Sequence, residues 1–212
     1  MKNEPRIDHA VVSGTFSLDG ETFDVDNNIW VLGDDTECVL IDAPHDVDAI
    51  IEVVGERLIK AVICTHAHDD HVGVAPALRQ RTKTPILLHP DDRPLWEQIH
   101  PDELWDADLS DGQTITIAGT ELTIMHTPGH APGAVCVYAP ALGCVFTGDT
   151  LFHGGPGATG RSFSDRPTIE SSIRAVLFEL PDETVVHTGH GDDTTIGAER
   201  ERSAEWQAEP AR

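Results

Sequence analysis

The stretch Thr65-His66-Ala67-His68-Asp69-Asp70-His71 follows directly after the apolar run Ala61-Val62-Ile63-Cys64. The run has the composition of a buried strand, so the stretch lies in the loop where that strand ends. Side chains in such a loop can converge on one point, and histidine and aspartate are common metal ligands. Without a cation, these ionisable groups would leave unpaired, desolvated charge. The stretch therefore predicts a metal site.

The spacing within this stretch predicts two metal ions. His66 and His68 are two residues apart on an extended loop and can point at one ion. Asp70 and His71 come next and turn toward a neighbouring ion. Both ions would then be bound from a single strand end.

Three more motifs supply candidate ligands, each directly after an apolar strand: Thr127-Pro128-Gly129-His130, Thr147-Gly148-Asp149-Thr150 and Thr188-Gly189-His190-Gly191. Each motif alone is also typical of an ordinary turn, and only the first stretch gives them weight. Asp149 is the natural bridge between two ions because a carboxylate has two oxygens to share. The candidate metal ligands are therefore His66, His68, Asp70, His71, His130, Asp149 and His190.

The rest of the chain alternates between strand and helix patterns. A β-α-β rhythm recurs, and no internal repeat or low-complexity linker interrupts it. This order predicts an α/β fold of two sheets flanked by helices, formed by residues 1–212 as one domain. Strands are expected at 10–12, 29–32, 38–41, 58–64, 86–88, 114–117, 122–125, 134–138, 144–146 and 184–187, and helices after Asp46 and at about 71–81, 94–99, 168–179 and 194–206.

The charge balance restricts the partners. The 212 residues hold 14 basic and 37 acidic side chains, a formal net charge of −23. Such a surface repels phosphate backbones and anionic membranes, so we expect a small-molecule substrate, no nucleic-acid partner and no membrane partner. The sequence does not indicate whether the protein is a monomer or an oligomer.

Location and cysteine chemistry follow from simple patterns. The N-terminal residues carry no apolar signal segment, so we expect a cytoplasmic protein. Residues 122–148 contain no Asp, Glu, Lys or Arg and are long enough to cross a bilayer. Prolines and glycines interrupt them, however, which favours buried strands over a membrane span. The four cysteines stand singly in apolar runs and are expected to be buried free thiols: Cys38, Cys64, Cys136 and Cys144.

The order of HxHxDH, TPGH, GDTLF and a late GH resembles the metallo-β-lactamase superfamily, and within it the short glyoxalase II-like (hydroxyacylglutathione hydrolase-like) metallo-hydrolases. The resemblance implies an αββα four-layer sandwich of two mixed β-sheets flanked by helices, with the site at one edge of the sheets. It implies that His66, His68 and His130 bind the first ion, that Asp70, His71 and His190 bind the second, and that Asp149 bridges them.

The same resemblance sets the other histidines apart from the site. His126 and His187 lie on strands shortly before motif histidines and are expected to pack or to form hydrogen bonds. Five more are expected on the surface or at caps, although His153 is close enough to Asp149 in sequence to touch substrate: His9, His45, His89, His100 and His153.

The predicted chemistry is hydrolysis. Two divalent ions, with Zn²⁺ expected and Fe or Mn as alternatives, supply hydroxide near neutral pH, so no Ser or Cys nucleophile is needed. Asp70 is the candidate catalytic residue, which orients the hydroxide and carries a proton. The expected activity is that of a thioesterase acting on a small thioester, an S-acyl conjugate of a low-molecular-weight thiol of the glutathione or mycothiol type.

Other activities of the superfamily stay open as alternatives. The sequence ends 22 residues after His190, so we expect no C-terminal glutathione-holding domain of the kind in long glyoxalase II enzymes. A mononuclear iron sulfur (persulfide) dioxygenase would use His66, His130 and Asp149. A lactonase or β-lactamase-type hydrolase and a non-catalytic metal-binding module are the remaining alternatives.

The segment Gly154–Asp165 follows Asp149 closely and resembles the matching loop of short actinobacterial glyoxalase II-like members. Arg161 is its only cation and is predicted to bind substrate through directed hydrogen bonds. Two structural alternatives stand beside this prediction. The segment could be a flexible glycine-rich connection, and Arg161 could form a salt bridge with Asp165.

Overall fold

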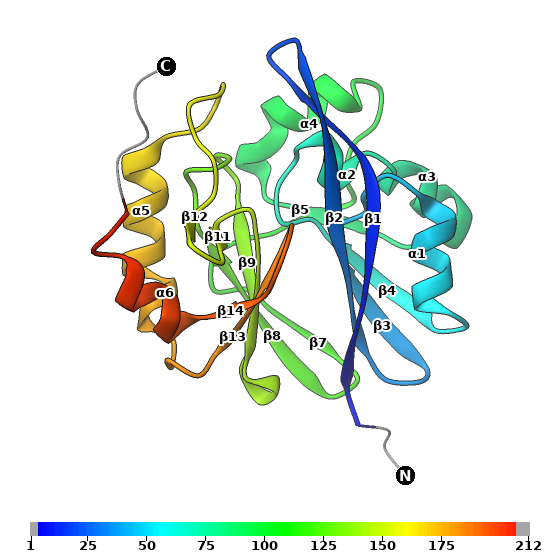
Figure 1. Cartoon of the computed structure of the whole chain (residues 1–212). Coiled ribbons are helices and arrows are strands. Elements are labelled where there is room, and N and C mark those ends of the chain that lie inside the picture. The colour runs from blue at the N-terminus through cyan, green and yellow to red at the C-terminus, as the bar shows by residue number, and fades with distance from the viewer. Residues whose placement is uncertain (1–3, 207–212) are drawn as a thin grey trace.

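A computed structural model describes residues 4–206, which form two facing six-stranded sheets (Figure 1). The first sheet opens with a long hairpin, whose strands pair over their full lengths. The first three strands are antiparallel and the next three join in parallel. In spatial order they are β1 (Arg6–Leu18), β2 (Glu21–Gly33), β3 (Glu37–Ile41), β4 (Leu58–Ile63), β5 (Ile86–Leu88) and β6 (Ala107–Asp108).

The second sheet is mixed as well. Its strands run in the spatial order β14-β13-β10-β9-β8-β7, and β10 pairs with β13 in parallel. A separate short ribbon of two strands, β11 (Leu151–Phe152) and β12 (Gly155–Pro156), follows β10. The strands of the sheet are β7 (Thr114–Ile117), β8 (Thr120–His126), β9 (Val135–Ala139), β10 (Cys144–Gly148), β13 (Val185–Thr188) and β14 (Thr194–Thr195).

Helices cover the outer face of each sheet. Four pack on the first sheet, and two pack on the second, where Figure 1 shows them on the opposite side of the molecule. The first group is α1 (Val47–Val54), α2 (Asp69–Val72), α3 (Ala75–Thr82) and α4 (Arg93–Ile99), and the second is α5 (Arg166–Ala175) and α6 (Ile196–Arg202). Short 3₁₀ turns lie at Pro90–Asp92, Pro140–Leu142 and Leu177–Glu179.

Strand alternation explains the layers. Along β2, Ile29 and Val31 pack against the helices, whereas Trp30 and Leu32 pack against the second sheet. Successive side chains of a strand point to opposite faces, so an unbroken apolar strand buries both. Three separate cores result, one between the sheets and one under each helical layer. The predicted αββα four-layer sandwich is confirmed.

The predicted helix at 71–81 is wrong in one respect, because the structure divides it into α2 and α3. Pro76 has no backbone N–H to donate to the Val72 carbonyl, so the helical ladder cannot continue. The Val72 carbonyl instead lies 3.0 Å from Nε2 of His100. The break leaves α2 as a single turn that carries Asp70 and His71.

The last predicted helix also differs. It was expected at 194–206 but begins at Ile196, because Thr194 and Thr195 pair with β13 as a short strand. Thr195 then caps the helix, and its hydroxyl accepts a hydrogen bond from the Ala198 N–H at 3.3 Å. The helix ends at Arg202.

The topology brings the motif loops to one edge. Strands β8 and β10 are both antiparallel to β9, and β13 is parallel to β10, so these three strands end at the same edge of the second sheet. The motifs with His130, Asp149 and His190 follow these three ends. The motif with His66 follows β4 of the facing sheet.

Two smaller expectations can be compared with the described residues. All four cysteines are buried and free, as predicted. Within residues 4–206, no helix combines the length and the apolar character that crossing a bilayer requires.

Candidate metal centre

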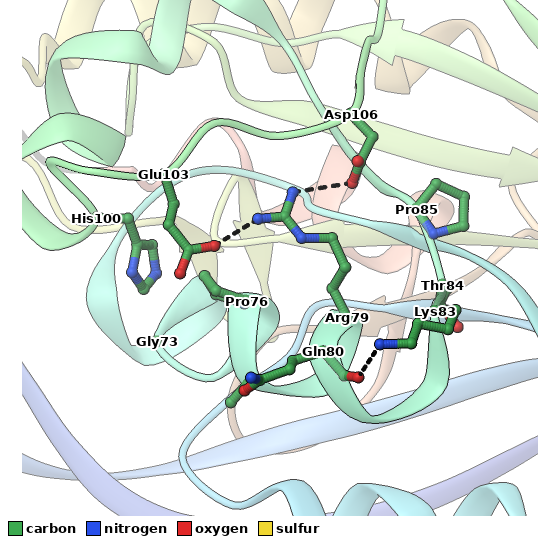
Figure 2. A pocket seen from close by; sticks show the side chains of 11 residues that line it. Gly73, Pro76, Arg79, Gln80, Lys83, Thr84, Pro85, His100, Glu103 and Asp106 are labelled. Carbon is green, nitrogen blue, oxygen red and sulfur yellow. Dashed lines mark hydrogen bonds and ion pairs between the residues drawn. The ribbon is translucent and has the colours of Figure 1, made fainter.

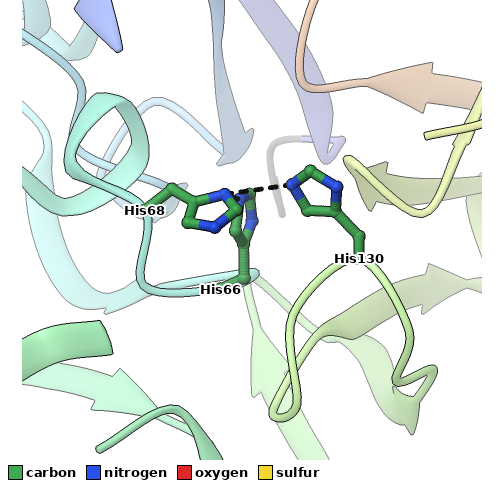
Figure 3. Close-up of side chains that lie close together, drawn as sticks. All are labelled: His66, His68 and His130. Carbon is green, nitrogen blue, oxygen red and sulfur yellow. Dashed lines mark hydrogen bonds between the residues drawn. The ribbon is translucent and has the colours of Figure 1, made fainter. Parts of the chain in front are cut away.

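The first donor set consists of His66, His68 and His130, shown in Figure 3. Nδ1 of His68 lies 3.0 Å from Nε2 of His66 and 3.0 Å from Nε2 of His130. His66 and His68 come from the loop after β4, and His130 comes from the loop after β8 of the other sheet. All three residues are buried. Three converging imidazoles are a common zinc ligand set.

The second donor set consists of Asp70, His71 and His190. Nε2 of His190 lies 3.2 Å from Nε2 of His71 and 3.1 Å from Oδ2 of Asp70. Asp70 and His71 stand on the single turn of α2, and His190 follows β13. This set also draws its side chains from both sheets.

Asp149 lies between the two sets. Its Oδ1 is 3.2 Å from Nε2 of His71, and its Oδ2 is 3.5 Å from Nε2 of both His130 and His190. The carboxylate thus faces one histidine of the first set and two of the second. The structure therefore brings together all seven residues that the sequence singled out, with Asp149 in the bridging position.

The surroundings of the donors fit divalent cations. Four of the histidines have their second ring nitrogen bonded to an oxygen: His66 to the Thr65 hydroxyl at 3.1 Å, His71 to Asp42 at 2.8 Å, His130 to the Ala158 carbonyl at 2.8 Å and His190 to the Asp26 carbonyl at 2.7 Å. Such partners fix the orientation of each ring and leave its Nε2 atom free to bind a metal ion. Oδ1 of Asp149 is buried and forms no hydrogen bond, and its neighbour at 3.2 Å is Nε2 of His71, itself a candidate metal ligand, which suits an oxygen that binds a cation.

The glycines of two motifs are required by crowding at the centre. A Cβ at Gly189 would lie 2.3 Å from Oδ1 of Asp149, and a Cβ at Gly148 would lie 2.4 Å from Oγ1 of Thr65. Gly148 also has a φ of +48°, in the left-handed region. The Gly-Asp and Gly-His pairs therefore allow the two loops to approach the centre closely.

Asp42 supports the centre and was not predicted from the sequence. Its carboxylate accepts hydrogen bonds from the Thr65 N–H at 2.7 Å and the Thr65 hydroxyl at 2.8 Å, besides the contact with His71. It stands directly after β3, beside the end of β4. A charged residue closing an apolar strand was the available signal.

Asp92 joins the loops of the first donor set and was also missed. Its buried carboxylate accepts hydrogen bonds from the Ala67 N–H at 2.7 Å and the Gly133 N–H at 2.5 Å. Ala67 lies between His66 and His68, and Gly133 follows His130. Burial raises the pKa of Asp92 to about 7. Nothing in the local sequence marks this residue.

One of the histidines assigned to the surface or to caps, His45, was assigned wrongly. His45 is half-buried, and its Nε2 lies 2.7 Å from Oδ1 of Asn27. His9 is exposed on the surface, as expected, but it also stacks on Trp30, with 4.1 Å between ring centroids, and its Nε2 lies 2.9 Å from Oδ1 of Asn28. The local sequence could not reveal these contacts, because Asn27 lies 18 residues from His45 and Asn28 lies 19 residues from His9.

The two histidines expected to pack behave as predicted. His126 lies 2.9 Å from the Pro132 carbonyl, and His187 packs against Trp30 and Phe146. His126 also forms a cluster with His89 and Asp91. The two rings of that cluster are stacked 4.0 Å apart at 12°, so their nitrogen lone pairs run parallel and do not converge on one ion.

Arg161 is separated from the first donor set by the ring of Phe16. Its guanidinium pairs with Glu21 at 2.9 Å and lies 4.7 Å from the ring centre of Phe23. It is also 6.0 Å from the ring of Phe16, which itself lies 5.1 Å from the ring of His68. The alternative salt bridge with Asp165 is wrong, because Glu21 is the partner.

The segment from Gly154 to Asp165 is held at several points. The Ser162 N–H donates to Asp19 at 2.9 Å, and the Asp165 N–H donates to the Gly129 carbonyl at 2.7 Å. The Asp165 carboxylate caps α5 through the Thr168 N–H. Together with the Ala158 contact, these bonds connect the segment to the β1–β2 hairpin and to the loop of His130.

A cavity of about 750 Å³ lies away from the centre, between α3 and the chain before β6 (Figure 2). Its arginine, Arg79, is already paired with Glu103 at 2.5 Å and Asp106 at 3.1 Å. Lys83 donates to the Gln80 carbonyl at 2.9 Å. The charge of Arg79 in this cavity is therefore already neutralised by two carboxylates.

The chain belongs to the metallo-β-lactamase superfamily, whose sequence profile matches residues 22–190. It is 34% identical over 188 residues to the hydroxyacylglutathione hydrolase GloC of Haemophilus influenzae, a match that covers 81% of this chain and 87% of GloC. The family predicted from the motifs is thus confirmed, and hydroxyacylglutathione hydrolases are among the relatives.

Two solved structures share the fold at moderate identity. TTHA1623 in a di-iron-bound form has a TM-score of 0.73 and 32% identity, covering 82% of this chain and 92% of that one. ETHE1 from Myxococcus xanthus has a TM-score of 0.71 and 26% identity, covering 88% and 80%. The family and the donor cluster imply divalent metal ions in this chain as well.

The two donor sets differ in protonation. Burial lowers the pKa of His68 to about 3 and that of His66 well below its usual value. Burial also acts to lower the pKa of His190, but the charge of Asp149 outweighs it and raises the pKa to about 10. The pKa of His71 is raised in the same way, against burial, by the charges of Asp149 and Asp70. Without metal, the second set therefore carries protons where a cation would sit.

We predict that the two ions bind with different proton release. At pH 7 the first equivalent should displace no proton from His66 or His68, whereas the second should displace protons from His71 and His190. The second binding constant should therefore rise about tenfold per pH unit for each proton released. Calorimetric titration of metal-free protein in buffers of different ionisation enthalpy measures this, and equal release by both equivalents would contradict it.

We also predict that Asp149→Ala impairs metal binding and activity more than folding. The carboxylate faces both donor sets, so its loss should reduce the bound metal below the wild-type number. Strand β10 packs through residues before Asp149 and should remain folded. Elemental analysis and circular dichroism give the two readouts, with the exposed Asp192→Ala as the matched control. Full metal content and full turnover would remove Asp149 from the centre.

Proposed function

We propose that this protein is a dinuclear metal-dependent hydrolase of a small thioester, an S-acyl conjugate of a low-molecular-weight thiol. The observation that carries the proposal is the position of Asp149, whose carboxylate faces both donor sets. A shared carboxylate is typical of two-metal hydrolytic sites. The 34% identity with a hydroxyacylglutathione hydrolase supports a thioester as the substrate.

Bound divalent ions would supply Lewis acidity and an ionised water at neutral pH, and Zn²⁺ is the expected metal. In the reaction, a water oxygen bonds to the carbonyl carbon, the carbon–sulfur bond breaks, and a proton passes to the thiolate. Asp70 is the proposed proton carrier. Its buried carboxylate is held ionised, since burial raises its pKa but the charge of His71 and the hydrogen bond from His190 lower it further.

The surroundings of the centre suit a small substrate. Phe16 lies against His68, and Arg161 lies over Phe16 and Phe23, so aromatic and cationic groups adjoin the first donor set. The side chain of Arg161 is 32% exposed in spite of its ion pair with Glu21, so part of the guanidinium can still donate to a substrate. The cytoplasmic location and the absence of nucleic-acid and membrane partners remain predictions from the sequence.

The second candidate is the mononuclear iron dioxygenase. The likeness to ETHE1 and to a di-iron-bound neighbour favours iron, and His66, His130 and Asp149 lie close enough together to form its site. Nε2 of His130 is 3.5 Å from Oδ2 of Asp149. The two candidates differ in co-substrate, because a dioxygenase consumes O₂ and a hydrolase consumes water.

The test is turnover of a panel of S-acyl thiols by protein of known metal content. We expect thiol release without O₂ uptake, and more than one equivalent of metal in protein purified without added metal. A reproducible single iron with O₂ uptake on a thiol persulfide would establish the dioxygenase instead. Loss of activity after chelation, and its return with Zn²⁺, should accompany the hydrolase.

We predict that Arg161→Ala raises KM for the thioester about tenfold, as expected for a lost charged hydrogen bond. Metal content should be unchanged, as should turnover of a small ester that lacks the thiol. Glu21→Gln is the matched control, because it removes the ion pair and keeps the guanidinium. If both variants lose activity equally on both substrates, Arg161 shapes the loop and does not bind the thiol.

A further inference from the structure

The amide of Asn27 lies against the second donor set. Nδ2 of Asn27 is 3.2 Å from Oδ2 of Asp70 and 3.4 Å from Nε2 of both His71 and His190. Asn27 stands on β2 and is 1% exposed. It therefore reaches the centre from a strand that carries none of the seven donors.

The other end of this amide is held by His45. Nε2 of His45 lies 2.7 Å from Oδ1 of Asn27. His45 has a φ of +47°, which is uncommon for a residue with a side chain. Its ring packs on the backbone of Gly14, where a Cβ would lie 2.1 Å from Nδ1 of His45. A glycine on β1 and a left-handed residue before α1 together make room for this ring.

The contacts decide which way the amide points. Were Oδ1 turned toward the centre, it would face Oδ2 of Asp70, and two acceptors would lie 3.2 Å apart. With Nδ2 in that place, the amide donates to Asp70 and accepts from Nε2–H of His45. Both ends of the buried amide then have a partner, and Nδ2 also faces the ring nitrogens of His71 and His190, whose protons a bound cation displaces.

We propose that Asn27 is a positioning residue of the second metal site, which orients the Asp70 carboxylate and is itself oriented by His45 and Gly14. A hydrogen bond to the ligand oxygen restricts the rotation of the carboxylate, so less conformational freedom is lost when a cation binds. The first donor set receives no such contact from Asn27. The effect of Asn27 should therefore fall on one ion only.

The neighbouring Asn28 has a separate role. Its Nδ2 donates to the Thr188 carbonyl at 3.0 Å and to the Gly191 carbonyl at 3.0 Å, on either side of His190. Asn28 thus holds the backbone of one ligand loop, whereas Asn27 touches the donor atoms themselves. We therefore expect a substitution of Asn27, and not one of Asn28, to change the affinity of the second ion selectively.

The experiment titrates metal-free protein with Zn²⁺ and measures the two equivalents separately. For Asn27→Ala we expect the second equivalent to bind about 10- to 100-fold more weakly and the first to keep its affinity. His45 and Gly14 do not contact the metal-binding atoms, so His45→Ala and Gly14→Ala should lower the affinity for the second equivalent of Zn²⁺ only through Asn27. Thr15→Ala is the matched control, because its exposed side chain lies next to Gly14 on the opposite face of β1.

Three results would overturn the proposal. An unchanged second equivalent in Asn27→Ala, or an equal loss of both, would leave Asn27 with a purely structural role. Tighter binding of the second ion by Asn27→Asp would show that an oxygen at this position faces the ion. If Asn27→Ala does not fold, Gly14→Ala and His45→Ala decide the question. The readout is ion binding alone, so its outcome is independent of the thioester substrate.

Discussion

The shared carboxylate of Asp149 is the constraint on which the rest of the structure depends. Five histidines and Asp70 direct their donor atoms at two points only a few ångströms from it. In a buried site these groups cannot all be satisfied by one another, and a cation is the partner that suits them. The glycine beside each late ligand, the single-turn α2 and the loops at the common edge all serve to bring the donors this close.

The donors are supported from several layers of the fold. Asp42 follows β3 and holds His71, the segment after β12 holds His130 through Ala158, and β2 holds His190 through the Asp26 carbonyl. Each support comes from an element other than the one that carries the ligand. The geometry of the centre is therefore a property of the assembled sandwich and not of any one motif.

The sequence patterns were sufficient to predict two sheets flanked by helices and the seven candidate donors, because both depend on short-range patterns, whereas the four-layer sandwich followed from the family resemblance. The stretch from His66 to His71 holds four donors within six residues, and unbroken apolar strands such as β4 require cover on both faces. Asp92, Asn27 and His45 could not be found in this way, since each acts through contacts with segments that are distant in the sequence. Arg161 was identified as a cation near the centre, but its partner, Glu21, is 140 residues away.

The donors come from two sheets that otherwise meet through an apolar core and a few hydrogen bonds, such as those of Asn28 and Trp30 to the Thr188 carbonyl. The loop after β4 supplies four of them, and the loops after β8, β10 and β13 supply the other three. Bound ions thus act as a cross-link between the halves of the sandwich, much as a disulfide joins distant segments. Any ligand that binds only the folded state stabilises it by mass action. In this protein that stabilisation couples the two sheets, so that neither half can open without releasing its metal.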